Sequence, residues 1–365
     1  MNRNYKIFRF SLIFLGVLVF FASSCKKDSD KELDATSNEH PIDIHPNGRV
    51  ASLLMSDTEF DSWISNDNYN NESERKALIK DVYKKFKDDF DYIFLVLNVD
   101  EKPAGFPYGQ LIHVSNNVEG IGLDKFDYSS EYGSAGKLKA VMHLTRLDYL
   151  QNGPSLHELM HNWANFGIYT EFVTGTGASI SSVAYKPHWG FTGGSTKGQL
   201  GGFKQSTLVD HGSNSYTVEQ FGGFANGGNS KPYNELELYL MGMIPVSQVT
   251  DFDVFTDITS LTAENTHFNF IANTRTTYTP EKLIEELGAR EPSSTDSQKD
   301  FKLLVLVLTN KPLTDDQWDK VDKQSELFGK KGDNGINSYN FWEATGGKGT
   351  METNNIENSV LGASK

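Results

Sequence analysis

Two apolar runs, far apart in the chain, set the strongest limit on its fold. Residues 91–99 read DYIFLVLNV and residues 301–310 read FKLLVLVLTN, and both are almost continuously apolar. Short runs of this kind, rich in β-branched and aromatic residues, are typical of strands buried inside a sheet. A third segment, 133–145, alternates between polar and apolar residues and predicts a strand at a sheet edge beside a cleft.

Helices are predicted between and after these strands. Apolar residues recur at helical spacing in four segments, 73–90, 233–243, 279–290 and 314–331. Residues 174–228 differ, because they hold 13 of the 32 glycines and show little helical periodicity. Such a stretch predicts loops and short strands that form the wall of a binding cleft. The mixture predicts an α+β (mixed α/β) fold, with one domain over residues 46–365 in two lobes around a cleft.

The N-terminal 45 residues are expected to lie outside this domain. Residues 1–24 join a basic start to an apolar run of 13 residues, which is typical of a signal peptide and short for a membrane span. Cys25, the single cysteine, follows Ala-Ser-Ser and so resembles the acylated cysteine of a bacterial lipoprotein. The alternative is a general secretory signal with a chance cysteine. Residues 25–45 are charged and predict a flexible tether.

We therefore expect an exported lipoprotein, held by lipid on Cys25 and located at the outer membrane, on its periplasmic or cell-surface face. Removal of residues 1–24, which carry three positive and no negative charges, moves the formal net charge from −14 to −17. A chain this acidic repels phosphates, which argues against nucleic acid as a partner. With its one cysteine acylated, the mature chain has no disulfide framework.

The segment LHELMHNWANFG, residues 156–167, contains candidate metal ligands and a candidate catalytic base. On a helix expected to end at Gly167, His157 and His161 lie one turn apart and can offer imidazole nitrogens to one point. A catalytic Zn²⁺ takes three protein ligands and a water. Glu158, beside the first histidine, is the candidate general base for that water. The alternative is an ordinary helix whose histidines are satisfied by hydrogen bonds.

This motif resembles that of the zincin metallopeptidases. More narrowly, LHELMHNW, a downstream HWGF and LELYLMGM are similar to a group of exported, mostly uncharacterised bacterial proteins of the zinc-peptidase type. The resemblance implies a zinc-dependent peptidase, an endopeptidase in our interpretation, that hydrolyses peptide bonds of a protein or peptide substrate. It also implies an active-site helix packed against a mixed sheet.

The third zinc ligand lies outside this helix. A zincin subgroup places a histidine six residues after the second ligand, but that position is Gly167. Two candidates remain, His188 in KPHWGFTGG and Glu237 in NELELYLMG. We favour His188, because it matches the His-Trp pair of the similar proteins and because imidazole suits zinc. Glu237 would then orient a ligand histidine.

Two residues are weaker candidates, and two other functions stay open. Tyr239 and His211 could donate to a developing oxyanion or support a ligand, although a core tyrosine and a surface histidine are the more frequent explanations of such residues. The first alternative function is a lipid-anchored protein that binds a glycan or a protein partner, with a structural or relic metal site. The second is a zinc hydrolase that acts on a non-peptide bond.

Overall fold

The computed structural model describes residues 40–171, 173, 187–264 and 266–362. The predicted signal peptide, Cys25 and most of the predicted tether lie outside the described residues. None of the helices in the described ranges is long and apolar enough to cross a membrane. Regular structure begins before residue 45, where the tether was expected to end. Ile42–Ile44 form strand β1, because the Ile42 side chain is buried and the strand pairs with β2.

The main sheet is mixed and has the strand order β1-β2-β14-β3-β7-β4, with β15 paired to β14. The two apolar runs of the sequence form its central strands, β3 (Tyr92–Leu97) and β14 (Asp300–Thr309), which pair in parallel. β2 and β7 extend the parallel part, whereas β1 and β4 are antiparallel to their neighbours. The chain thus has the α+β fold expected from its sequence. The remaining strands of this sheet are β2 (Ala51–Leu54), β7 (Ala140–Leu144), β4 (Gly109–His113) and β15 (Thr350–Glu352).

The edge of this sheet was predicted wrongly. β7, within the segment 133–145, lies between β3 and β4, and all five of its residues are buried. The edge strand is β4, whose residues after Gly109 are half-buried. β4 is short and lacks a strong apolar pattern, so its sequence gave no clear signal of a strand.

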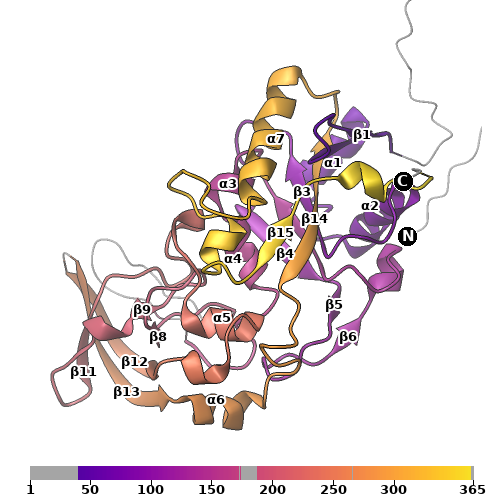
Figure 1. The fold of residues 1–365 in the computed structure, drawn as a ribbon. Helices are drawn as coiled ribbons and strands as arrows, with labels where there is room; N and C mark the ends of the chain where they lie inside the picture. The colour runs from indigo at the N-terminus through magenta and orange to yellow at the C-terminus, as the bar shows by residue number, and fades with distance from the viewer. Residues whose placement is uncertain (1–39, 172, 174–186, 265, 363–365) are drawn as a thin grey trace, which may run out of the picture. The chain divides into compact units, whose positions relative to one another are not determined.

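Helices cover both faces of the main sheet (Figure 1). On one face, helix α1 (Asp57–Ser65) and helix α2 (Glu72–Lys85) pack against the inward side chains of β3 and β14, such as Ile93 and Leu306. The opposite side chains of the same strands, such as Phe94 and Val305, meet the helices α4, α5 and α7. Successive strand residues point to opposite faces, so a continuous apolar run serves two cores. Besides α1 and α2, the α-helices of the described residues are α3 (Tyr149–Asn152), α4 (Ser155–Met160), α5 (Glu235–Met241), α6 (Pro280–Leu287), α7 (Asp315–Phe328) and α8 (Phe341–Ala344).

A second, antiparallel sheet with the order β10-β11-β13-β12 has a separate aromatic core. Its long hairpin of β12 (Phe252–Glu264) and β13 (His267–Tyr278) packs Phe255 and Phe270 against Phe191 and Phe203 from the glycine-rich segment. The described part of that segment contains short strands, as expected. The other strands are β5 (Ser115–Asn116), β6 (Phe126–Asp127), β8 (Gly193–Gly194), β9 (Phe203–Lys204), β10 (Val209–Asp210) and β11 (Ser215–Glu219).

His143 on β7 is a core residue of the main sheet. Its ring stacks on Tyr69 at a centroid distance of 4.7 Å, and its Nε2 accepts a hydrogen bond from the Trp63 indole over 3.3 Å. Burial lowers the pKa of His143 to about 3. The neutral ring is therefore part of the folded state.

His143 should make the stability of the fold dependent on pH. In the unfolded chain the pKa of His143 is about 6.5. The contribution of its neutral ring to the free energy of unfolding is therefore fully present above that pH and is lost as pH falls toward 3. The loss should reach several kcal/mol, at about 1.4 kcal/mol per pKa unit. In urea unfolding between pH 7 and pH 4, His143→Gln should weaken this dependence, whereas His211→Gln at an exposed site should not. An unchanged slope in His143→Gln would show that the ring does not carry the effect.

Candidate metal centre

The helix α4 is positioned by its buried face. Leu156, Leu159 and Met160 are fully buried in the core that covers the main sheet. At the start of the helix, Asn229 accepts a hydrogen bond from the Leu156 amide over 3.1 Å and donates to Ser155 Oγ over 2.9 Å. The first of these contacts satisfies a backbone donor that a helix N-terminus leaves unpaired. His157 and Glu158 are mostly buried, but both line a cleft on the opposite side of the helix.

The helix is shorter than its sequence predicted. It ends at Met160, with His161 as its C-cap residue, and does not continue to Gly167. The amides of His161, Asn162 and Trp163 bond to carbonyls three residues back, which tightens the chain into a turn. At Gly167 a Cβ atom would lie 2.1 Å from Leu287 Cδ2, so a side chain at this position would have to displace the Leu287 side chain.

Three histidines converge beyond this turn. One ligand nitrogen from each of His157, His161 and His188 lies within 4.8 Å of the others, so the three residues form a group that could hold a metal ion. His157 Nε2 and His161 Nε2 are 3.3 Å apart. Two ligands of a tetrahedral ion with bonds of about 2.05 Å would be separated by roughly 3.3–3.4 Å. The observed spacing therefore matches that of two metal ligands.

The protonation of these rings also favours a cation between them. His157 Nδ1 donates to the Gln199 carbonyl over 2.8 Å, and His161 Nδ1 faces the Ala164 carbonyl at 3.3 Å. A carbonyl only accepts, so the proton of each neutral ring belongs on Nδ1. Burial lowers the pKa of both histidines, which keeps them neutral. Two unprotonated Nε2 atoms then face each other and need a positive partner.

His188 reaches this point through contacts with distant backbone. The Asn165 amide, just after the α4 turn, donates to the Pro187 carbonyl over 3.0 Å, and Thr170 Oγ1 donates to the His188 carbonyl over 3.1 Å. The His188 ring stacks on the His157 ring at a centroid distance of 5.3 Å. Burial, followed by the nearby His157, lowers the pKa of His188 to about 3, so its ring is neutral at neutral pH and keeps one nitrogen that can bind a metal ion.

Glu237 on α5 lies outside this histidine group and holds it in place. Its carboxylate accepts hydrogen bonds of 2.9–3.0 Å from the indole of Trp189 and from the amides of Gln199, Leu200 and Asn234. Burial raises the pKa of Glu237, whereas the four N–H donors lower it. Trp189 adjoins His188, and the Gln199 carbonyl binds His157. The carboxylate therefore fixes the backbone on both sides of the histidine group.

Glu158 lies at the junction of two cavities beside the edge strand β4. A cavity of about 270 Å³ is shared with Leu111, His113 and His161, and another of about 480 Å³ with Tyr108 and His157. Burial raises the pKa of Glu158 to about 8. A Cβ atom at Gly109 would lie 2.7 Å from Glu158 Cγ. Only glycine at the start of β4 therefore leaves room for this carboxylate.

The structure does not bring Tyr239 or His211 to the histidine group. Tyr239 is buried, and burial raises its pKa, although the neighbouring Arg290 partly offsets this effect. His211 is exposed beyond β10, where its Nε2 lies 2.9 Å from Thr217 Oγ1. His113, which the sequence indicates only as a core or edge residue of a strand, lies next to the site. Its Nε2 donates to the His161 carbonyl over 2.8 Å. No motif in the sequence marks this contact.

Replacing Glu237 with glutamine tests whether it holds the metal ligands. A glutamine offers one acceptor oxygen in place of two, so some of the four N–H donors lose their partner. We expect zinc affinity to fall about 10- to 100-fold, measured by competition with a chromophoric chelator. Glu235→Gln is the matched control, because Glu235 lies on the same helix but accepts from Ser195 and Thr250. Equal affinities in both variants and the wild type would contradict the assignment.

Comparison with known proteins adds no family to this geometry. No protein-family model matches the chain, and no curated protein or solved structure is significantly similar to it.

Proposed function

We propose that this protein is a zinc-dependent endopeptidase that hydrolyses peptide bonds in protein or peptide chains. The observation that carries the proposal is the position of Glu158. Its carboxylate opens into a cleft directly beside three neutral histidines whose free nitrogens converge. Metal ligands and a carboxylate base in one cleft are the components of metal-assisted hydrolysis.

The residues present fit a zinc ion. Three imidazoles form a ligand set that zinc accepts in catalytic sites, and the carbonyls of Gln199 and Ala164 fix the tautomer of two of them. We assign His157, His161 and His188 as the ligands. Glu237 is unsuited to that role, because its two oxygens are already occupied by four N–H donors. Zinc bound here would supply Lewis-acid chemistry, acidifying water and polarising a peptide carbonyl.

Glu158 is the general base in this proposal. The described residues offer its carboxylate no hydrogen-bond donor, so it is free to take a proton from water and return it to the leaving amine. Its pKa of about 8 results from burial alone. A cation held by the neighbouring histidines would favour the charged form of Glu158, which is the form that a base requires.

The position of the cleft along β4 supports cleavage at an internal peptide bond of the substrate rather than at its end. β4 is an edge strand of the main sheet, so its outer side can pair with an extended peptide. The two cavities that share Glu158 extend in both directions along β4, from Tyr108 and Gly109 to His113. Peptide segments on both sides of the scissile bond would thus be bound. Export and lipid anchoring through Cys25 stay predictions from the sequence.

The central test combines zinc content with cleavage of a protein substrate. Glu158→Gln should keep one zinc per chain and lose about 100- to 10,000-fold in kcat, because it removes only the base. His211→Gln serves as the control that retains activity. A Glu158→Gln variant that binds zinc and cleaves as well as the wild type would contradict the role of Glu158 as the base.

The ligand assignment makes a separate prediction. His188→Ala should reduce zinc stoichiometry well below one per chain after dialysis, because only two histidines remain. Zinc can be measured by atomic absorption, with circular dichroism to confirm folding. Full zinc retention in His188→Ala would contradict this ligand set. Absence of stoichiometric zinc from the wild type, with partner binding insensitive to chelator, would favour the alternative of a binding protein.

A further inference from the structure

The larger cavity beside Glu158 has aromatic walls that the proposed hydrolysis does not use. Tyr108 and Phe224, from different parts of the chain, both line it. Their side chains are 62% and 46% exposed, although exposed aromatic rings are costly to leave in water. Large exposed apolar residues gathered at a cleft often mark a binding site. The two rings therefore indicate a binding site for an apolar group of a ligand.

Both rings are held in position despite their exposure. The Tyr108 ring packs on Tyr149 at a centroid distance of 5.6 Å, and the Lys102 ammonium lies 5.4 Å from its centre. The Phe224 ring meets the His188 ring edge to face at 5.2 Å. Such contacts fix ring orientation before a ligand arrives, which lowers the entropic cost of binding.

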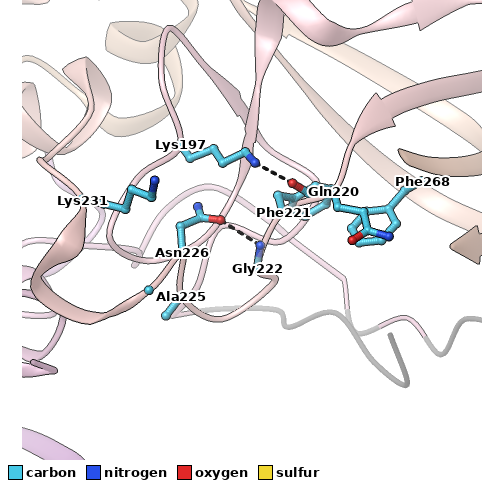
Figure 2. A pocket seen from close by; sticks show the side chains of 9 residues that line it. Lys197, Gln220, Phe221, Gly222, Ala225, Asn226, Lys231 and Phe268 are labelled. Atoms are coloured by element: carbon cyan, nitrogen blue, oxygen red, sulfur yellow. Dashed lines mark hydrogen bonds between the residues drawn. The ribbon is translucent and has the colours of Figure 1, made fainter. Parts of the chain in front are cut away.

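The loop that carries Phe224 is itself fixed by hydrogen bonds. Asn226 accepts a hydrogen bond from the Gly222 amide over 2.8 Å (Figure 2). It also donates to the Gly198 and Gly202 carbonyls over 3.0 Å each. The cavity in that figure, about 490 Å³ in volume, borders the same loop through Ala225. Phe224 is thus tied to the segment that also bears His188, so its ring has a defined place relative to the histidine group.

The chemistry of the cavity selects its occupant. Apart from His157 and Glu158, its described lining carries no ionisable side chain other than the tyrosine; prolines, glycines and an alanine complete it. An acidic side chain bound here would be repelled by Glu158. A basic side chain would lose its hydration shell and would find only the Glu158 carboxylate, the proposed base, as a charged partner. A volume of about 480 Å³ accommodates a large ring.

We propose that Tyr108 and Phe224 form a specificity subsite that binds a bulky hydrophobic or aromatic side chain of the substrate next to the scissile bond. This inference rests on the proposed function and adds a substrate class to it. Glu158 lines the same cavity, so a side chain held there belongs to a residue that adjoins the bond being cleaved.

The first experiment measures cleavage of fluorogenic peptides by the zinc-loaded protein. The peptides differ at one position, which is Phe, Ala or Asp. We expect kcat/KM to be about 10- to 100-fold higher for Phe than for Ala, as burial of one large apolar side chain predicts. Phe224→Ala and Tyr108→Ala should each reduce this preference about 10-fold with unchanged zinc content, whereas Phe224→Leu should keep most of it.

Tyr128→Ala is the matched control, because Tyr128 is 52% exposed and lines neither cavity beside Glu158. It should keep the wild-type preference. A wild-type preference for Asp or Ala overturns the inference, and so does a preference for Phe that survives in both Phe224→Ala and Tyr108→Ala.

The second experiment separates this subsite from the hydrolytic function. Binding of the same peptides to zinc-loaded Glu158→Gln is measured by calorimetry, which requires no turnover. Tighter binding of the Phe peptide, lost in Phe224→Ala, supports the subsite even if no peptide is cleaved, and only the proposed function then fails. Cleavage without any selectivity in rate or binding overturns the subsite and leaves the function standing.

Discussion

The buried carboxylate of Glu237 makes the interactions on which the position of the histidine group depends. The segment around His188 has little regular structure, so a sheet or helix cannot satisfy its backbone donors. Glu237 satisfies two of them and the Trp189 indole, and each donor left unpaired in the interior would cost about 1–3 kcal/mol. One side chain thereby orders a loop, and the loop presents both a histidine and the carbonyl that orients His157.

The main sheet provides the other half of the site. Its central parallel strands are buried on both faces, and α4 packs its apolar side chains on one of them. The helix is six residues long, so it presents His157 and Glu158 and then turns at His161 toward the loop of Pro187. Edge strand β4 approaches so closely that Gly109 cannot carry a side chain. Glu158, the histidine group and the edge strand β4 are thus held in one small region.

Much of this arrangement was predictable where the signal is local. The runs that became β3 and β14 and the helices α2, α5, α6 and α7 follow from periodicity within single segments. The edge strand β4 and the hairpin of β12 and β13 were missed. Short half-buried strands carry no pattern strong enough to separate them from loops, and in β12 a register shift between Ile258 and Ser260 interrupts the alternation.

The sequence by itself determined the spacing of His157, Glu158 and His161, because a helical turn places residues four apart on one face. It also left two candidates for a third ligand, His188 and Glu237. Only the tertiary structure decided that His188 joins His157 and His161, because the contacts that place it link segments far apart in the chain. Glu237 meets four N–H donors, and the Asn165 amide pairs with Pro187. Hydrogen bonds of this kind leave no periodic trace in the sequence, since any residue supplies the backbone half.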